Sequence, residues 1–430
     1  MHREIQVEIA VLGGGCAGLW LAHDFAKRGF TCALVEHGSL GGYASQGNQS
    51  WLHSGALYAV LESEQASDSS LAQGLRSTAR ECFKGYSRLR RFARRHCKHA
   101  IDSRSGCMFL YADQAKAERA HSTLTNYGLE PRVYTSRLEV LEPILTGTEA
   151  NVALVTRDLP FDAARILAAV SRRAAALGTR FVNASKTLDQ LEIVREGPHW
   201  VARDDSFAIH ASVIIFATGA LVLKQQDSWH FLAAPKPTIQ KCAVAAFNSR
   251  LCTRLLAFRI REAQGLNMVP FRSGTTMNLG DRDVETSDVL DRRVPDTFFD
   301  GLSDVLSLYA PGISRWRVPV RAHAYICQKV GNELSSSRPS IRYGKRHFFW
   351  SESQPGLYYA YPGKFTLSAN CSSALVRHIQ NSGVLTKRTS RTQIVPGRIP
   401  SICGSPYHID PTHRLVASKG GEVRFVSRYA

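Results

Sequence analysis

The sequence lacks any stretch that could cross a membrane as a helix, because no apolar run reaches about 18 residues. Residues 1–8 are polar and lead directly into an apolar segment, without the charged, apolar and small-residue order of a secretory signal. No internal repeat and no low-complexity tract is visible. These absences predict a cytoplasmic protein, with peripheral contact to a membrane as an open alternative.

Closely spaced cysteine pairs are missing as well. The ten cysteines are scattered, and no two of them have the C-x-x-C spacing of a zinc site or a redox dithiol. We therefore expect no metal site. In a cytoplasmic protein, most of these cysteines are expected to be reduced, buried side chains that behave as small apolar groups.

Acidic residues are few relative to basic ones: 36 Asp and Glu against 54 Lys and Arg give a net charge of +18. This charge can attract an anionic substrate, nucleic acid or a membrane surface, or it can serve solubility alone. The densest basic run, residues 88–98, has apolar residues at helical spacing and predicts an amphipathic helix with solvated arginines. No RNA-binding motif with interleaved aromatic residues is visible, so nucleic acid is not an expected partner.

The clearest positive signal lies at the N-terminus. Residues 7–12 are apolar and β-branched, which predicts a buried strand. A glycine-rich turn follows over residues 13–18, and residues 19–28 have helical periodicity that ends at Gly29. A second apolar strand is predicted at residues 31–35. The order strand, glycine turn, helix, strand predicts a β-α-β unit that binds a dinucleotide.

Each glycine of the G-x-G-x-x-G pattern has an expected role. Gly13 allows the tight turn, Gly15 lets the backbone approach a pyrophosphate, and Gly18 lets the helix pack closely on the strand. The helix N-terminus favours phosphate, and Glu36 can accept hydrogen bonds from ribose hydroxyls. The predicted cofactor site in this unit consists of Gly13, Gly15, Cys16, Ala17, Gly18, Glu36 and His37.

Two later segments favour FAD over NAD. Ala217-Thr218-Gly219 ends a buried strand in mid-chain, which indicates a second pass through the nucleotide domain. Gly363-Lys364-Phe365-Thr366 precedes a helix expected at residues 365–380. The N-terminus of that helix can stabilise negative charge at the pyrimidine edge of a reduced flavin.

The remaining patterns predict an α/β protein. We expect a Rossmann-type FAD-binding domain interleaved with an α+β substrate domain that contains a mixed or antiparallel sheet. Helices are expected at 61–100, 113–127, 137–141 and 162–177, and strands at 107–111, 132–134, 180–184, 191–195, 199–204, 208–210, 212–216, 338–342, 348–350 and 358–361. The FAD-binding parts are predicted at 5–80, 151–225 and 351–385, the substrate-domain parts at 81–150 and 226–350, and an irregular surface tail at 386–430.

These residues together resemble the D-amino acid oxidase superfamily of FAD enzymes. Residues 44–58, with the turn His53-Ser54-Gly55, resemble the polar loop and His-Ser-Gly turn that lie near the flavin in its members. Residues 71–143 resemble L-2-hydroxyglutarate dehydrogenases, whereas Arg338-Pro339, Arg342 and residues 363–366 resemble glycerol-3-phosphate dehydrogenases. In the Gly-Gly-Lys-Leu-Thr turn of the family, Pro362 replaces the first glycine. Because the chain follows neither branch throughout, its substrate stays open.

The resemblance implies oxidation of a C–H bond beside a hydroxyl or an amine, by hydride transfer to flavin. His53 is the first catalytic candidate, as a base for the hydroxyl proton or as a covalent tether of the flavin; the alternative is a histidine that shapes the loop. Arg338 and Arg342 alternate onto one strand face and suit a carboxylate or phosphate, unless they are solvated surface residues. Lys364 is expected to face the substrate or the flavin. Ser45 and Asn48 are expected either to contact the flavin or to shape the loop.

Other functions remain to be weighed against this one. The expected partner is a small anionic substrate, and the electron acceptor is oxygen, a quinone or another oxidant. The alternatives are a flavoprotein acting on a nucleic-acid-bound substrate, a flavin-binding protein without turnover, and an NAD-dependent dehydrogenase.

Overall fold

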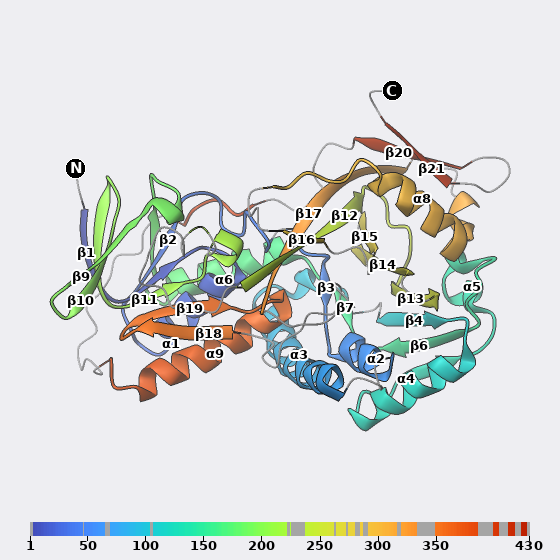
Figure 1. Ribbon diagram of the computed structural model, residues 1–430, viewed down its shortest axis with the longest axis horizontal. Coiled ribbons are helices and arrows are strands. Elements are labelled where there is room, and N and C mark those ends of the chain that lie inside the picture. The colour runs from blue at the N-terminus through green and yellow to red at the C-terminus, as the bar shows by residue number, and fades with distance from the viewer. Residues whose placement is uncertain are drawn as a thin grey trace.

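The computed structural model places two β-sheets side by side, with helices packed against both (Figure 1). It describes residues 3–45, 47–64, 69–103, 106–221, 224, 237–261, 264–271, 274–279, 284–286, 291–315, 320–332, 349–385, 399–403, 412–417 and 423–427. Within these ranges, no helix is both long and apolar enough to span a bilayer. Nor do three or more His, Cys, Asp or Glu side chains in these ranges form a group that could hold a metal ion.

The first sheet is built on the N-terminal β-α-β unit. Strand β1 pairs in parallel with β2 on one side and with β11 on the other, and α1 makes the crossover from β1 to β2. Its strand order is β18-β19-β11-β1-β2-β8, and the β9-β10 hairpin is attached to β11. The strands are β1 (Arg3–Leu12), β2 (Cys32–Glu36), β8 (Arg180–Asn183), β9 (Glu192–Glu196), β10 (His199–Arg203), β11 (Phe207–Phe216), β18 (Phe349–Gln354) and β19 (Leu357–Tyr361). The predicted Rossmann-type unit is therefore confirmed.

One helical layer covers a face of this sheet. It consists of α1 (Cys16–Lys27), α3 (Ser69–His96), α6 (Ala163–Ala176) and α9 (Phe365–Asn381), whose buried apolar side chains share a core with β1, β2 and β11. Arg88 of α3 points into this layer, and its Nη2 donates to both carboxylate oxygens of the buried Asp24 of α1, at 2.7 Å each. The prediction that residues 88–98 present only solvated arginines is therefore wrong at Arg88, because a buried carboxylate binds its guanidinium.

The second sheet is mixed, as predicted. Its order is β21-β20-β17-β12-β15-β14-β13-β4-β6-β5, with β16 on β12; β13 pairs in parallel with β4, whereas the neighbouring pairs β13-β14, β12-β17 and β4-β6 are antiparallel. The strands are β4 (Cys107–Tyr111), β5 (Arg132–Tyr134), β6 (Val152–Thr156), β12 (Pro237–Phe247), β13 (Leu255–Arg261), β14 (Gln264–Phe271), β15 (Gly274–Leu279), β16 (Val284–Thr286), β17 (Val320–Asn332), β20 (His413–Ala417) and β21 (Val423–Ser427).

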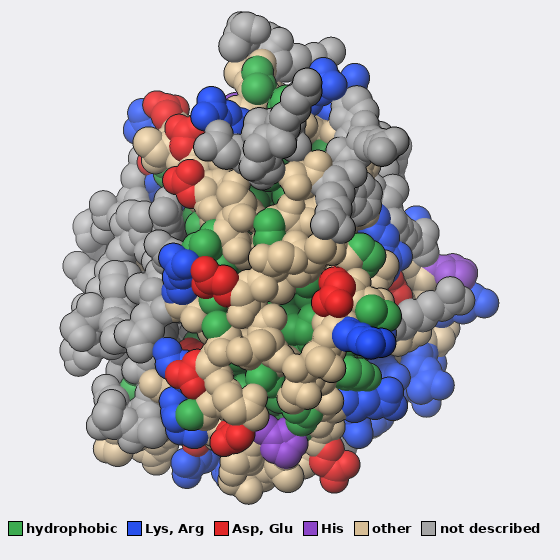
Figure 2. Space-filling view, turned by 90° about the vertical axis from the view of Figure 1, so that its right-hand side faces the viewer, with side chains coloured by type: hydrophobic (Ala, Val, Ile, Leu, Met, Phe, Trp, Pro, Cys, Tyr) green, Lys and Arg blue, Asp and Glu red, His purple; other side chains and the backbone are tan. Residues whose placement is uncertain are grey.

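Helices cover both faces of the second sheet. α2 (Ala56–Glu64) and α4 (Gln114–Asn126) pack on one face, and α8 (Phe298–Tyr309) packs on the other. A two-stranded ribbon, β3 (Trp51–Leu52) with β7 (Leu159–Pro160), lies between the sheets. Short helices complete the chain at Leu138–Leu141 (α5), Lys98–Ala100, Pro143–Leu145, Leu188–Gln190, Gly219–Leu221 and Pro311–Arg315. Figure 2 views the molecule from the end that carries the second sheet and shows basic side chains along the flanks, with acidic ones among them.

Several predicted elements are corrected. The two strands expected at 208–210 and 212–216 are one strand, β11, because its first half pairs with β10 on one edge while the whole strand pairs with β1 on the other. The helix expected at 61–100 is two helices: α2 begins at Ala56, inside the segment expected to be a loop, and α3 ends at His96.

The C-terminal tail and one domain segment also differ from expectation. Residues 386–430 were expected to be irregular, but β20 and β21 form a hairpin that extends the second sheet at the edge of β17. The edge of β17 offers unpaired backbone groups, which the tail satisfies. β6 lies in the segment assigned to the FAD-binding part, yet it pairs with β4 and β5 of the second sheet. The domain boundaries themselves stay a prediction.

Candidate functional site

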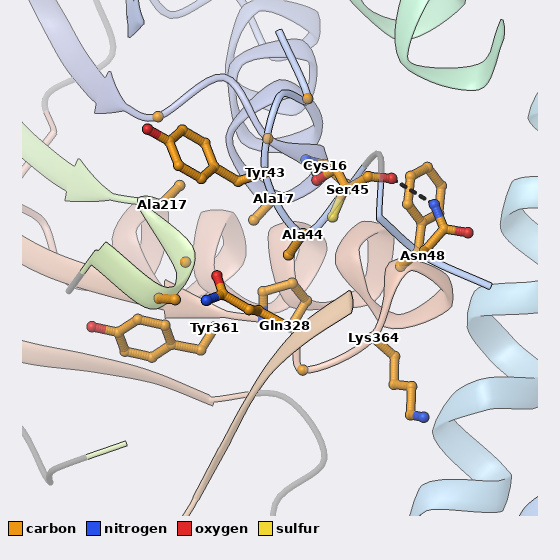
Figure 3. A pocket seen from close by; sticks show the side chains of 18 of the residues that line it. Cys16, Ala17, Tyr43, Ala44, Ser45, Asn48, Ala217, Gln328, Tyr361 and Lys364 are labelled. Atoms are coloured by element: carbon orange, nitrogen blue, oxygen red, sulfur yellow. Dashed lines mark hydrogen bonds between the residues drawn. The ribbon is translucent and has the colours of Figure 1, made fainter. Parts of the chain in front are cut away.

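One cavity extends from the turn after β1 to the start of α9, with about 1300 Å³ of free space when its open mouth is counted. Segments far apart in the sequence form its walls (Figure 3). The sequence-predicted residues that line it are Gly13, Gly15, Cys16, Ala17, Glu36, Ser45, Asn48, His53, Ala217, Thr218, Gly219, Gly363, Lys364, Phe365 and Thr366. Gly18 and His37 are not among its lining residues.

The turn after β1 brings backbone atoms close together where only glycine fits. Gly13 has a φ of +109°, and a Cβ there would lie 2.6 Å from the carbonyl oxygen of Ala217 at the end of β11. A Cβ on Gly18 would lie 1.8 Å from the carbonyl oxygen of Gly13. Gly18 therefore lets α1 pack against the turn, as predicted, and contributes to the cavity only through that packing.

The loop after β2 covers the N-terminus of α1. The backbone N–H of Cys16 donates to Oγ of Ser45 at 2.9 Å. Asn48 donates from Nδ2 to the Ser45 carbonyl oxygen at 2.5 Å, and its Oδ1 accepts from the N–H of Ser50 at 2.7 Å (Figure 3). Both polar atoms of the Asn48 amide thus stabilise the loop, which supports the loop-shaping alternative for this residue.

Glu36 fixes the opposite side of the glycine turn. Its buried carboxylate accepts from the N–H of Gly14 at 2.7 Å and from the N–H of His37 at 2.8 Å. The ring Nδ1 of His37 lies 3.0 Å from the same carboxylate. The contact with this carboxylate raises the pKa of His37 above its usual value, against the opposing effect of burial. His37 therefore supports Glu36 from outside the cavity wall.

His53 lies at the other end of the cavity, where the β3 segment meets the start of α9. It is buried, its ring packs on that of Trp51 with centroids 4.6 Å apart, and its backbone N–H donates to Oγ1 of Thr366 at 3.3 Å. The first residue of α9, Phe365, packs on Phe161 in the core. The fold thus brings His53 and the α9 N-terminus, more than 300 positions apart in sequence, into direct contact.

Asp158 is a buried carboxylate beneath this end of the cavity that the sequence did not single out. The N–H of Ser54 and Oγ1 of Thr156 donate to it. Burial raises the pKa of Asp158 to about 6, although these hydrogen bonds oppose the shift. Asp158 therefore fixes the backbone of the residue that follows His53. A lone Asp between two short strands gave no sequence signal for this role.

The second sheet closes the cavity with residues that the sequence analysis missed. Cys327 and Gln328 of β17 line it, and Figure 3 shows Gln328 among the side chains of the cavity. His323 of the same strand, a weaker candidate from the sequence, is buried but is not among the lining residues. Burial lowers its pKa to about 4, so its imidazole is neutral at pH 7. Ala44, Gln49 and Trp51 also line it, from the loop that resembles the flavin-proximal loop of the family. The other lining residues, which were not among the predicted site residues, are Gly41, Gly42, Tyr43, Leu188, Ala220, Leu221, Ala360, Tyr361 and Pro362.

Of the three predicted cationic site residues, only Lys364 is among the residues that the structure describes. Lys364 borders the cavity, but its side chain extends away from the glycine turn, and its Nζ lies 5.6 Å from the ring centroid of Tyr58 (Figure 3). Arg338 and Arg342, and the strand expected at 338–342, lie outside the described residues. Their proposed contact with an anion therefore stays a prediction.

Comparison with known protein families gives one match across most of the chain. The family described as FAD dependent oxidoreductase matches residues 8–376. Curated relatives match shorter segments: one component of the anaerobic glycerol-3-phosphate dehydrogenase of Haemophilus influenzae is 33% identical over 102 residues, which are 24% of this chain and 15% of that protein. A probable FAD-dependent oxidoreductase of Pseudomonas aeruginosa is 42% identical over 60 residues, which are 14% of this chain and 15% of that protein.

Solved structures share the fold over nearly the whole chain at low sequence identity. L-proline dehydrogenase from P. horikoshii superposes with a TM-score of 0.64 at 14% identity, covering 89% of this chain and 95% of that one. Glycine oxidase from Geobacillus kaustophilus gives 0.62 at 16% identity, covering 88% and 95%. These likenesses establish the arrangement of the two sheets and leave the substrate undetermined.

Proposed function

Because the chain belongs to the family of FAD-dependent oxidoreductases, we propose that it oxidises a C–H bond next to a hydroxyl or an amine in a small anionic substrate. The observation that supports this most directly is the shared cavity, whose walls include the glycine turn, His53 and the start of α9. The NAD-dependent alternative is set aside, because the matched family uses FAD.

The residues present fit FAD. The absence of side chains at Gly13 and Gly15 leaves a cradle at the start of α1, where backbone N–H groups and the helix dipole favour a pyrophosphate. We assign the ribose hydroxyls to Glu36, and the pyrimidine edge of the flavin to the α9 N-terminus at residues 363–366. FAD, when bound, supplies the acceptor for the hydride.

The chain's own residues have three tasks in this proposal. His53 accepts the proton of the substrate hydroxyl or amine, because an imidazole at the cavity wall is suited to act as a general base. Asp158 holds the backbone next to His53 through the N–H of Ser54. Arg338 and Arg342 are assigned to the negative group of the substrate, since paired guanidinium groups bind carboxylate or phosphate in two-pronged fashion.

The first test is the visible spectrum of the purified protein, before and after acid precipitation. We expect a flavin spectrum; colour in the supernatant indicates a non-covalent cofactor, and colour in the pellet indicates a covalent tether, with His53 the first residue to replace. Anaerobic mixing with 2-hydroxy acids, amino acids and glycerol 3-phosphate is then expected to bleach the flavin with one class. A flavin that none of these reduces contradicts the proposed substrate class.

A pair of variants tests the role of His53. His53→Asn is expected to slow anaerobic flavin reduction by about 100-fold or more, because it removes a general base. Tyr58→Phe, whose ring lies 5.8 Å from that of His53, is the matched control and is expected to retain most of the rate. Equal effects in the two variants would show that packing alone is disturbed. Oxygen and quinone analogues added to the reduced enzyme identify the acceptor.

A further inference from the structure

Two cysteines that are distant in sequence lie directly opposite each other on neighbouring strands, and one of them lines the cavity. Cys242 of β12 and Cys327 of β17 are register partners in an antiparallel pair. Both are buried thiols, and they belong to one small apolar cluster with Val244. Their side chains therefore leave the sheet on the same face, and Cys327 lines the cavity on that face.

We propose that Cys242 and Cys327 form a reversible cross-strand disulfide beside the cavity when the protein meets hydrogen peroxide. Opposed residues of antiparallel strands have Cα atoms about 4.5 or 5.5 Å apart, and both spacings fall within the range of natural disulfides. Their Cβ atoms, at about 4.5–5.5 Å, must approach slightly before the bond can close. A bond closed under such strain is easily reduced, which a reversible link requires.

The chemistry balances with peroxide as the oxidant. The sulfur of Cys327 attacks peroxide, the O–O bond breaks, and the products are a sulfenic acid and one water. The sulfur of Cys242 then attacks that sulfenic acid, forms the S–S bond and releases the second water. In total, two thiols and one hydrogen peroxide give one disulfide and two waters. Burial normally protects a thiol, but the cavity gives a small oxidant access to Cys327.

Closing this bond would alter the loop that covers the nucleotide end of the cavity. Sγ of Cys242 accepts from Nε2 of Gln49 at 3.5 Å and from Nδ2 of Asn278 at 3.6 Å. Gln49 also lines the cavity, and its carbonyl oxygen accepts from Oγ1 of Thr276 at 2.9 Å. When the Cys242 sulfur turns toward Cys327, it releases the Gln49 amide. The thiol state of β12 and β17 is thereby coupled to the loop.

The link can be tested by peptide mapping, independently of turnover. The FAD-loaded protein is treated with hydrogen peroxide, unfolded in N-ethylmaleimide and digested with trypsin. Residues 242–250 and 322–329 are then separate peptides with one cysteine each. We expect them to appear joined, two hydrogens lighter than their sum, and to separate on treatment with dithiothreitol.

Three variants control this experiment. Cys242→Ser and Cys327→Ser must each abolish the joined peptide, whereas Cys252→Ser, another buried cysteine outside this pair, must retain it. Oxidation of the partly exposed Cys97 shows that the peroxide was effective. Absence of the joined peptide while Cys97 is oxidised overturns the proposal, as does a joined peptide that forms only after unfolding.

The coupling to the cavity rests on the assignment of the cavity to FAD and has its own measurement. In fully cross-linked protein, the dissociation constant of FAD is expected to rise about three- to tenfold, the effect of one lost hydrogen bond. It should return to its starting value after reduction, and Cys327→Ser should show no such response to peroxide. An unchanged constant in cross-linked protein overturns the coupling. Failure of the proposed oxidation reaction would leave the peptide map unaffected.

Discussion

The two ends of the cavity are built in different ways. At the nucleotide end, the strand, turn and helix that approach the cofactor are consecutive in sequence, from Arg3 to Lys27, and Glu36 follows on the next strand. At the other end, the backbone of His53 meets Thr366 of α9, and this contact joins residues more than 300 positions apart. Local geometry therefore determines the first end, and the packing of the whole molecule determines the second.

A substitution at Gly18 should have the largest effect. If the variant kept its structure and its FAD, local geometry would not be what determines the nucleotide end. Gly18→Ala places a Cβ 1.8 Å from the carbonyl oxygen of Gly13, so α1 must move away from the turn. We expect the protein to lose FAD on gel filtration and to be destabilised by about 3 kcal/mol or more. Absorbance of the retained flavin and urea unfolding measure the two effects.

The matched control for this substitution is Gly38→Ala. Gly38 follows Glu36 in the loop, and an added Cβ there meets nothing within 4 Å. It should retain FAD and unfold as the parent does. If Gly18→Ala also retained FAD, the close approach of helix and turn would not be what determines the nucleotide end.

The sequence predicted those parts of the fold and of the site that depend on contacts between residues close together in the chain. The G-x-G-x-x-G pattern predicted the β-α-β unit because each glycine is required by its immediate neighbours, and Glu36 followed from the length of the unit. The sequence did not indicate that Gln328 and Cys327 would reach the same cavity, because nothing local to β17 differs from an ordinary strand. Likewise, the hairpin of β20 and β21 depends on the free edge of β17, with which β20 pairs, and that edge exists only after the second sheet has formed.

The helical layer offers the next test, since it joins the two ends. The Asp24 carboxylate on α1 binds Arg88 of α3 and accepts from Oγ of Ser372 of α9 at 2.6 Å. Asp24→Ala leaves a partly buried guanidinium without its partner, and we expect a loss of about 3–5 kcal/mol in unfolding free energy. Asp205→Ala, which removes an exposed ion pair with Lys186, should change unfolding very little. Equal losses would contradict the importance of burial.

Asp158 and Asp24 should respond to pH with opposite sign. Burial raises the pKa of Asp158 to about 6. Between about pH 4 and pH 6, the folded protein therefore keeps a proton on this carboxylate that the unfolded chain has already released. Its contribution to stability therefore falls as pH rises through that window, by about 3 kcal/mol at most. For Asp24, hydrogen bonds from His23 and Ser372 and the charge of Arg88 outweigh burial and lower the pKa. Its stabilising contribution is lost only as pH falls below about 4.

Asp158→Asn isolates the first of these effects. The amide can still accept from Ser54 but does not titrate, so the variant should lack the decline in stability that the parent shows between about pH 4 and pH 6. Urea unfolding at these two pH values measures the difference. Parallel changes in parent and variant would mean that the Asp158 carboxylate is ionised throughout this range.

The smallest expected effect lies at the nucleotide end, where neighbouring residues in sequence also fix the electrostatics. The close contact of the His37 ring with the Glu36 carboxylate is the main cause of the raised pKa of His37 and exceeds the opposing effect of burial. Glu36→Gln keeps an acceptor for the N–H of Gly14 but removes the charge, so the pKa of His37 should fall while FAD affinity weakens about tenfold or less. Titration of the His37 ring by NMR measures the first change. Glu4→Gln, beside His210 at the sheet edge, is the control and should leave His37 unaffected. If the pKa of His37 does not change in Glu36→Gln, the charge of Glu36 does not determine it. The two side chains would then interact through packing alone, and charge would contribute little at the nucleotide end.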